Sequence, residues 1–117
     1  RRKLNIEMKK FFSKHDFLIC PTASVSPFSV ENPYVKEIDG QKCKTYVDWF
    51  SITFAISMTS CPALSIPCGF DKAGLPMGIQ IIAPPRREAA LLNFGCQLQE
   101  IFSFSRELPI SPRGEDG

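Results

Sequence analysis

A helix that is apolar on nearly every side constrains this chain more than any other feature. Thr45-x-x-Asp48 has the form of a capping box and predicts that a helix starts at Thr45. A helix without a polar face is stable only when protein surrounds it. The rest of the predicted elements are too few to enclose this helix, so we expect the chain to lack part of the core that covers it. The apolar residues of the helix are Tyr46, Val47, Trp49, Phe50, Ile52, Phe54, Ala55, Ile56 and Met58.

Hydrophobic spacing predicts the other elements. Apolar residues recur at helical spacing in the first dozen residues and again after Pro84-Pro85, which predicts a helix at each place. Residues 17–20 predict a strand that is apolar on both faces, as in a sheet covered by helices on both sides. Residues 62–67 and 77–82 predict a β-hairpin, with Gly74 in a left-handed turn position. The predicted order is helix, strand, long loop, helix, β-hairpin and helix, which is an α/β fold with a sheet flanked by helices.

Two segments carry no sustained periodicity. Residues 23–44 are punctuated by serine, proline and glycine, and a loop of that length is uncommon in a compact domain. Such a loop is functional, disordered or laid over a surface that other protein supplies, and the last of these is favoured. Residues 105–117, with two prolines and two glycines, predict an irregular tail. The 117 residues form one domain at most, or one portion of a larger domain.

Charge and cysteine usage narrow the class of protein. With 14 basic and 12 acidic residues, the net charge of +2 does not predict nucleic-acid binding. The basic residues of the first helix are interpreted as a solvated face rather than a site for an anionic partner. The longest apolar stretch, about residues 49–58, is interrupted by hydroxyl residues and is too short to span a membrane. Five cysteines without a C-x-x-C pair predict reduced, buried thiols, and hence a cytoplasmic location.

The residues alone indicate no active site. His15 is the one histidine, so any serine or cysteine triad would have to use it, and its predicted place at a helix end favours a structural role. The glycines form neither a P-loop nor a dinucleotide-binding motif. Cys61 and Cys68 bracket one strand without a nearby histidine, which favours two buried thiols over a metal site. The aromatic residues of the helix at 45–60 are core residues or the wall of an apolar ligand pocket, and plain core is the more common case.

A resemblance to a known family extends this interpretation. Pro62-Ala-Leu-Ser-Ile-Pro-Cys-Gly-Phe70, followed by Gly74-Leu-Pro-Met-Gly-Ile-Gln80, resembles the C-terminal signature of the amidase-signature family. Asp16-Phe-Leu-Ile-Cys-Pro-Thr22, Tyr46-Val-Asp-Trp49 and Glu88-Ala-Ala-Leu-Leu92 are similar to other segments of that family, in the same order. The resemblance therefore covers nearly the whole chain, as the C-terminal portion of an amidase-signature domain with a mixed β-sheet.

The resemblance implies amide hydrolysis, or ammonia transfer from an amide, without a metal or cofactor. Members use a serine nucleophile, a second serine and a lysine base in segments that precede the resembling ones. This chain has no Ser-Ser pair and no Gly-Gly pair. A lysine base must contact the serine relay to act. We therefore assign no catalytic residue and expect the chain to be inactive alone, as a C-terminal fragment of an amidase that supplies sheet, core and pocket wall.

The helix that begins near Tyr46 lines the acyl side of the substrate pocket in relatives. By that resemblance Trp49, Thr53 and Ile56 are the expected substrate-binding residues. In family members that use glutamine, an acidic residue on this helix holds the substrate's amino group, and Asp48 is the candidate here. The neighbouring apolar residues favour an apolar or aromatic amide. Thr53 also has a plain structural interpretation, a hydrogen bond to the carbonyl one turn back.

Two functional hypotheses remain open. In the first, the chain is part of an amidase and contacts a small-molecule amide only together with the catalytic part. In the second, it is a non-catalytic binding module derived from an amidase, with the apolar helix at 45–60 as its interaction surface, because exposed apolar patches mark interaction sites. The expected protein partners are a complementing chain or a second copy of this chain. A third possibility, a cysteine-dependent or redox protein, has little support.

Overall fold

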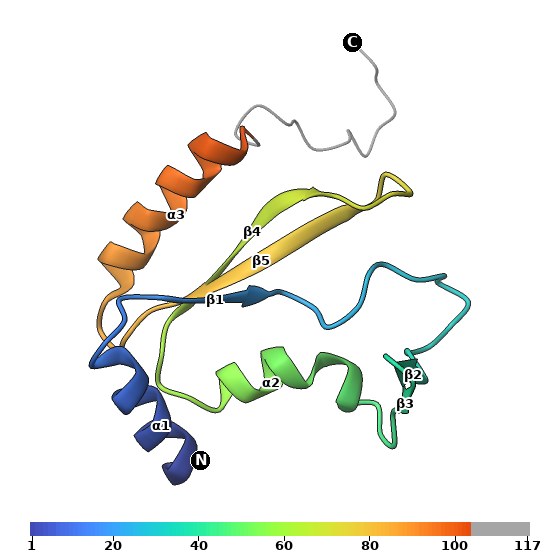
Figure 1. Ribbon diagram of the computed structural model, residues 1–117, viewed down its shortest axis with the longest axis horizontal. Coiled ribbons are helices and arrows are strands. Elements are labelled where there is room, and N and C mark those ends of the chain that lie inside the picture. The colour runs from blue at the N-terminus through green and yellow to red at the C-terminus, as the bar shows by residue number, and fades with distance from the viewer. Residues whose placement is uncertain (104–117) are drawn as a thin grey trace, which may run out of the picture.

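The computed structural model describes residues 1–103, so the predicted tail at 105–117 lies outside the described residues. The predicted α/β class and the predicted order of elements are confirmed (Figure 1). One short hairpin is added within the segment predicted as a long loop. The elements in chain order are α1 (Arg2–Phe12), β1 (Leu18–Pro21), β2 (Glu37–Ile38), β3 (Gln41–Lys42), the 3₁₀ turn η1 (Asp48–Phe50), α2 (Ser51–Ser57), β4 (Ala63–Phe70), β5 (Pro76–Ile82) and α3 (Glu88–Phe102).

The main sheet has three antiparallel strands in the order β1-β5-β4. Ile81, in the central strand, pairs with Ile19 on one side and with Leu64 on the other. The register of β4 shifts between Pro67 and Gly69. Gly74 has the predicted left-handed conformation, with φ of +77°, in the turn that joins β4 to β5.

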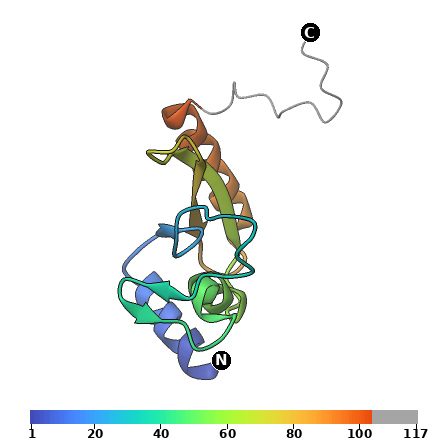
Figure 2. The same cartoon turned by 90° about the vertical axis from the view of Figure 1, so that its right-hand side faces the viewer.

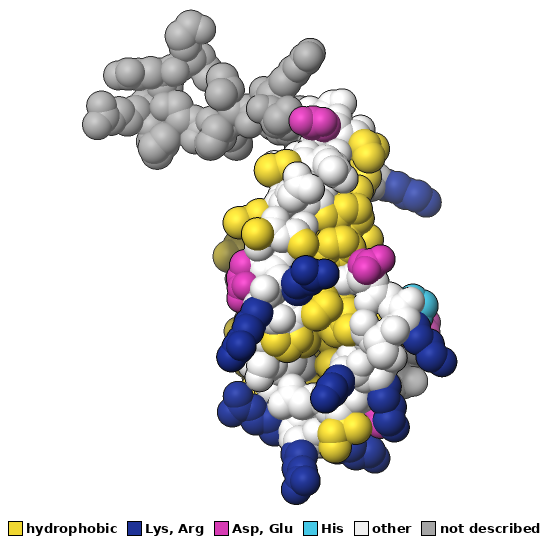
Figure 3. Space-filling view, turned by 90° about the vertical axis from the view of Figure 1, so that its left-hand side faces the viewer, with side chains coloured by type: hydrophobic (Ala, Val, Ile, Leu, Met, Phe, Trp, Pro, Cys, Tyr) yellow, Lys and Arg dark blue, Asp and Glu magenta, His cyan; other side chains and the backbone are white. Residues whose placement is uncertain are grey.

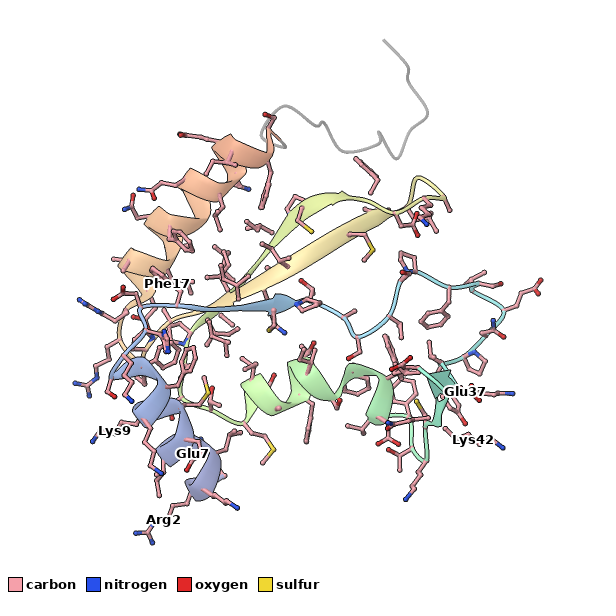
Figure 4. The ribbon with its side chains drawn as sticks, in the orientation of Figure 1. Arg2, Glu7, Lys9, Phe17, Glu37 and Lys42 are labelled. Atoms are coloured by element: carbon pink, nitrogen blue, oxygen red, sulfur yellow. The ribbon has the colours of Figure 1, made fainter. Side chains whose placement is uncertain are left out.

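Helix α3 covers one face of this sheet and forms the core with it. Side chains directly opposite each other on paired strands share a face. Leu64 pairs with Ile81, and Gly95 of α3 lies so close to Leu64 that a methyl group at position 95 would overlap the Cδ2 atom of Leu64. Phe17 stacks on Phe94 of α3 with ring centroids 4.5 Å apart, where β1 meets the helix (Figure 4). The buried centre of this layer consists of Ile66, Ile81, Ala83 and Leu91.

The other face of the sheet turns toward α2 (Figure 1). The helix predicted from Thr45 begins at Asp48 instead, as a 3₁₀ turn that continues into α2. None of the residues of α2 is buried, and the side chains of Tyr46 and Phe54 are 56% and 48% exposed. The predicted strand at 17–20 is likewise only half covered, because Ile19 is 47% exposed. The described residues therefore leave the apolar helix largely uncovered, as the sequence predicts.

A two-stranded hairpin, β2–β3, lies beside the start of α2 (Figures 1 and 2). Its two-residue turn is Asp39-Gly40, and both residues have positive φ angles, 48° and 76°. That conformation matches the right-handed twist of the strands it joins. Glu37 and Lys42 are directly paired across the hairpin, which places opposite charges side by side (Figure 4). The hairpin gives residues 37–42, within the segment at 23–44, a regular structure near the helix.

The face formed by α1 and α3 has a mixed surface. Figure 3 shows hydrophobic side chains along the middle of this face and Lys and Arg side chains gathered around the α1 end. The predicted solvated helix face is present in α1, where the Lys10 ammonium lies 3.1 Å from the Glu7 carboxylate in an exposed ion pair. Exposed pairs of this kind contribute little stability.

Candidate functional site

The end of β1, the start of β5 and the η1 turn meet around a hollow of about 250 Å³. Its walls are mostly apolar. Ligand pockets of drug size typically enclose about 300–1,000 Å³, so this hollow fits one end of a small molecule rather than the whole of it. The residues that line it are Thr22, Ala23, Val25, Ser26, Pro27, Phe28, Trp49, Pro76, Met77 and Gly78.

Trp49 forms part of this wall. It is half-buried, and its ring meets that of Phe28 edge to face with centroids 5.5 Å apart. Its indole Nε1 is buried and has no hydrogen-bond partner within the described residues. Because an indole N–H is only a donor, this atom is suited to a ligand acceptor such as a carbonyl oxygen.

Thr53 lies one turn after Trp49, and its hydroxyl already donates a hydrogen bond within the protein. Thr53 Oγ1 donates a hydrogen bond to the carbonyl oxygen of Thr22, 2.8 Å away. The alternative of a bond to the carbonyl one turn back is wrong for Thr53. That bond is made instead by Ser57, whose hydroxyl donates to the Thr53 carbonyl at 3.0 Å. A threonine hydroxyl has one proton, so Thr53 is left able only to accept from a ligand.

Ile56 is placed apart from the other two predicted residues. It is half-buried near the end of α2 and, like Thr53, is not among the residues that line the hollow. Its carbonyl oxygen accepts the hydroxyl of Thr59 at 2.7 Å. The structure therefore brings Trp49 and Thr53 together through Thr22, while substrate contact by any of the three stays a prediction.

The carboxylate of Asp48 accepts hydrogen bonds from the turn that precedes it. Its Oδ2 accepts the backbone N–H groups of Lys44 and Thr45, at 2.6 and 2.9 Å, and its Oδ1 accepts the Thr45 hydroxyl at 3.0 Å. The bonds from Thr45, ahead of that from Lys44, lower the pKa of Asp48 below its ordinary 3.8 because they favour the ionised form. Asp48 lines a different hollow, beside β2–β3. This arrangement does not favour Asp48 as a holder of a substrate amino group.

The Asp48 turn is expected to loosen in acid. A lowered pKa in the folded state gives stability that is present above the unfolded pKa and is lost as the pH falls through the folded value. We expect protection of the Lys44 and Thr45 amides from hydrogen exchange to fall below about pH 4. Asp48→Asn is expected to lower the protection of these two amides already at neutral pH.

The matched control is Asp16→Asn, which changes an exposed carboxylate outside this turn and is expected to leave both amides protected. NMR-detected exchange of the two amides is the measurement. Equal protection at pH 3 and pH 7 in the unmodified chain would contradict the role given to Asp48.

The described residues do not assemble a nucleophile with a base. His15 is exposed and stacks on Phe11, with ring centroids 4.5 Å apart. Burial raises the pKa of the Cys20 thiol, with an opposing hydrogen bond to Gln80, and a raised pKa reduces thiolate character. Within residues 1–103, no lysine ammonium makes a hydrogen bond with a serine hydroxyl; the Ser13 hydroxyl donates to the backbone carbonyl of Lys10, not to its side chain.

The described part of the chain also lacks a cluster of metal ligands and a helix able to cross a membrane. Residues 1–103 contain no group of three or more His, Cys, Asp and Glu side chains placed to hold a metal ion. None of the helices in the same part is long and apolar enough to cross a bilayer.

Of the ten residues that line the hollow only Trp49 was predicted as a site residue, and the nine others include Thr22, Met77 and Gly78. Thr22 ends the Cys-Pro-Thr turn that follows the first predicted strand, and Met77 and Gly78 open the return strand. The sequence does offer a signal for these residues, because the end of one strand and the start of a neighbouring antiparallel strand lie at the same edge of a sheet.

A family model described as Amidase matches residues 1–92. The chain belongs to the amidase family. This confirms the resemblance inferred from the sequence, which rested on the same residues. The matched range covers every described element up to the first turns of α3.

Members of the amidase family with similar sequences include two subunits A of glutamyl-tRNA(Gln) amidotransferase. That of Thermodesulfovibrio yellowstonii is 31% identical over 110 residues, which are 94% of this chain and 22% of the relative. That of Alkaliphilus metalliredigens is 32% identical over 110 residues, 93% of this chain and 21% of the relative. The chain thus spans about a fifth of the length of the curated relatives that it matches.

Solved structures agree with this amidase-family assignment at the level of fold. The structure of 6-aminohexanoate cyclic dimer hydrolase superimposes with a TM-score of 0.75 at 23% identity, over 92% of this chain and 24% of that one. The same enzyme complexed with substrate gives a TM-score of 0.69 at 22% identity, with the same coverage. At such identities the likeness establishes the fold alone.

Proposed function

We propose that this chain is the pocket-forming part of an amidase-family enzyme that hydrolyses the C–N bond of a small apolar or aromatic amide. The chain supplies sheet, core and one wall of the acyl-side pocket, and a different stretch of polypeptide supplies the serine nucleophile and the lysine base. The chain alone is inactive. The observation that carries this proposal is the apolar hollow beside Trp49, in a chain that belongs to the amidase family.

The chemistry of the hollow supports this division of work. An aryl or short acyl group fits walls made of Val25, Phe28, Trp49 and Met77, and the unpartnered Nε1 of Trp49 can donate to a substrate oxygen. The acyl transfer itself needs a nucleophile in hydrogen-bond contact with a base. The described residues contain no such pair, so we assign that step to the catalytic polypeptide.

The location and partner follow from the same proposal. All five cysteines are free, which supports a reducing compartment, and we place the protein in the cytoplasm. The principal partner is the polypeptide that carries the serines and lysine, whether in the same chain or in a complementing one. Its expected docking area includes α2, whose apolar side chains are exposed within the described residues.

That exposed helix also favours a second candidate function. A chain that retains the fold but meets no catalytic polypeptide would present Tyr46, Phe54 and Met58 as an apolar surface for another protein. Under this alternative the hollow beside Trp49 is a remnant and no amide is hydrolysed.

The decisive experiment is an assay of amide hydrolysis by complementation. Three samples are compared on a panel of aryl and fatty amides: this chain, a separately expressed polypeptide carrying the serines and lysine, and their mixture. We expect turnover only in the mixture. Trp49→Ala in this chain is expected to raise the KM for aryl amides about tenfold, the loss of about 1.4 kcal/mol of contact with the ring.

Matched controls separate the outcomes. Cys96→Ser changes an exposed residue of α3 and is expected to leave the mixture active, whereas a mixture whose nucleophilic serine is replaced with alanine is expected to be inactive. Turnover by this chain alone would overturn the proposal. An inactive mixture containing a chain that unfolds cooperatively would favour the binding module instead.

A further inference from the structure

We propose that Thr22 fastens α2 to the sheet and that Thr53 is a positioning residue, which sets Trp49 at the wall of the hollow through its bond to Thr22. The inference rests on the proposed function only in treating the hollow as a substrate pocket. The bonds themselves belong to the described residues. They assign to the Thr53 hydroxyl a role other than direct contact with a substrate.

Thr22 uses three of its polar groups in links to different elements. Its backbone N–H donates to the carbonyl oxygen of Gly78 in β5, at 3.1 Å. Its carbonyl oxygen accepts the Thr53 hydroxyl from α2, at 2.8 Å. Its hydroxyl lies 2.9 Å from that of Ser65 in β4, so one of the two hydroxyls donates to the other. One residue therefore joins α2 to both strands of the β4–β5 hairpin.

The hydrogen bond between the hydroxyls of Thr22 and Ser65 passes over a glycine, which has no side chain in its way. In the sheet order β1-β5-β4, Thr22 follows β1 and Ser65 lies in β4, so the link must pass over the central strand. It passes over Gly78, where a Cβ atom would lie 3.1 Å from Thr22 Oγ1 and 3.4 Å from the carbonyl oxygen of Ile66. Gly78 is therefore explained by close approach rather than by an unusual backbone conformation.

This fastening matters because α2 has few other constraints. It is a seven-residue helix with no buried residue. Helices so short are not stable by themselves, so contacts outside the helix decide its position. Trp49 lies one turn before Thr53 in the continuous run of η1 and α2. A shift of α2 relative to Thr22 would carry the Trp49 ring with it and change the shape of the hollow.

Trp49 is the chain's one tryptophan, which makes its fluorescence a direct report on this position. The variants are Thr53→Val, which keeps shape without the hydroxyl, and Thr53→Ser, which keeps the hydroxyl. The matched control is Ser57→Ala, which removes the next hydroxyl along α2, one that bonds only within the helix.

We expect Thr53→Val to shift the emission of Trp49 to longer wavelength and to raise its quenching by acrylamide. The displaced population of α2 is expected to rise about fivefold, the usual effect of losing one hydrogen bond. Thr53→Ser and Ser57→Ala are expected to match the unmodified chain. Since Thr53 is exposed, all three variants are expected to keep the far-UV circular dichroism of the fold.

Two outcomes would overturn the inference. One is a Thr53→Val chain whose Trp49 emission and quenching equal those of the unmodified chain. The other is a Thr53→Ser chain that behaves as the valine variant does, since the hydroxyl would then not be the cause. Should Thr53→Val lose its fold, Thr53→Ala provides the same test with a smaller side chain. None of these readouts needs enzymatic activity, so an inactive mixture in the complementation assay would leave them unaffected.

Discussion

Replacing Ile81 with alanine is expected to remove about 3 kcal/mol of unfolding free energy, because a buried isoleucine loses its transfer energy and leaves a cavity. Ile81 is fully buried, near the end of the central strand β5 and beneath α3. The described core is small, so a loss of this size is expected to lower the urea midpoint of unfolding strongly. Urea titration followed by circular dichroism is the measurement.

The control for Ile81 lies directly across the strand pair. Ile19 has the same side chain and pairs with Ile81, yet it is 47% exposed. Ile19→Ala is expected to cost about 1 kcal/mol, since only about half of its surface leaves water on folding. Equal losses from the two substitutions would show that the layer between the sheet and α3 is not the stabilising core of this chain.

A leucine at position 95 is expected to push α3 away from the sheet and to cost up to about 3 kcal/mol. The reason is the overlap with Leu64 that even a methyl group would create at Gly95. A leucine at the neighbouring position 96, on the exposed side of the same helix, is expected to change stability by less than about 0.5 kcal/mol.

A double-mutant cycle tests whether Leu64 is the cause. Leu64→Ala alone leaves a cavity, and Gly95→Leu alone overfills the layer, but the two together exchange volume across the contact. We expect the double variant to recover at least about 1 kcal/mol relative to the sum of the two single losses. Strict additivity of the two losses would mean that the cost at position 95 arises somewhere other than Leu64. The unfolding free energies of the unmodified chain, the two single variants and the double variant are all measured by urea titration.

The sequence predicted the fold well where periodicity is strong. The helix in the first dozen residues, the β-hairpin and the last helix each carry an apolar stripe, and each lies where the stripe predicts it. The short hairpin was missed although Asp39-Gly40 is a strong two-residue turn signal, because the flanking strands have only two residues each and show no alternation. The start of the second helix was placed at Thr45 because Asp48 fits a capping box. Asp48 does accept the Thr45 N–H as a capping box requires, but the Thr45 hydroxyl donates to Asp48 Oδ1 and does not accept the Asp48 N–H, which bonds the Thr45 carbonyl in a turn before the helix.

The candidate site was predictable only in part. Helical spacing groups Trp49 with Thr53, because residues one turn apart share a helix face, and substrate contact by either residue stays a prediction. Spacing within one helix cannot show that the Thr53 hydroxyl is bonded to Thr22, 31 residues earlier in the chain. Ile56 has the right spacing too, but of the three predicted residues only Trp49 lines the hollow. Contacts between distant segments decide which of several equally spaced residues reach a site.

The proline in β4 makes this outer strand a poor border for the addition of a further strand to the sheet. An outer strand recruits another through its row of outward N–H and C=O groups. Pro67 lacks an N–H, and the irregularity at Gly69, with φ of +145°, breaks the spacing of that row in β4. The opposite border, β1, also contains a proline, Pro21, but at its last residue, so Leu18, Ile19 and Cys20 keep their N–H groups. A larger sheet is therefore expected to extend from β1 more readily than from β4.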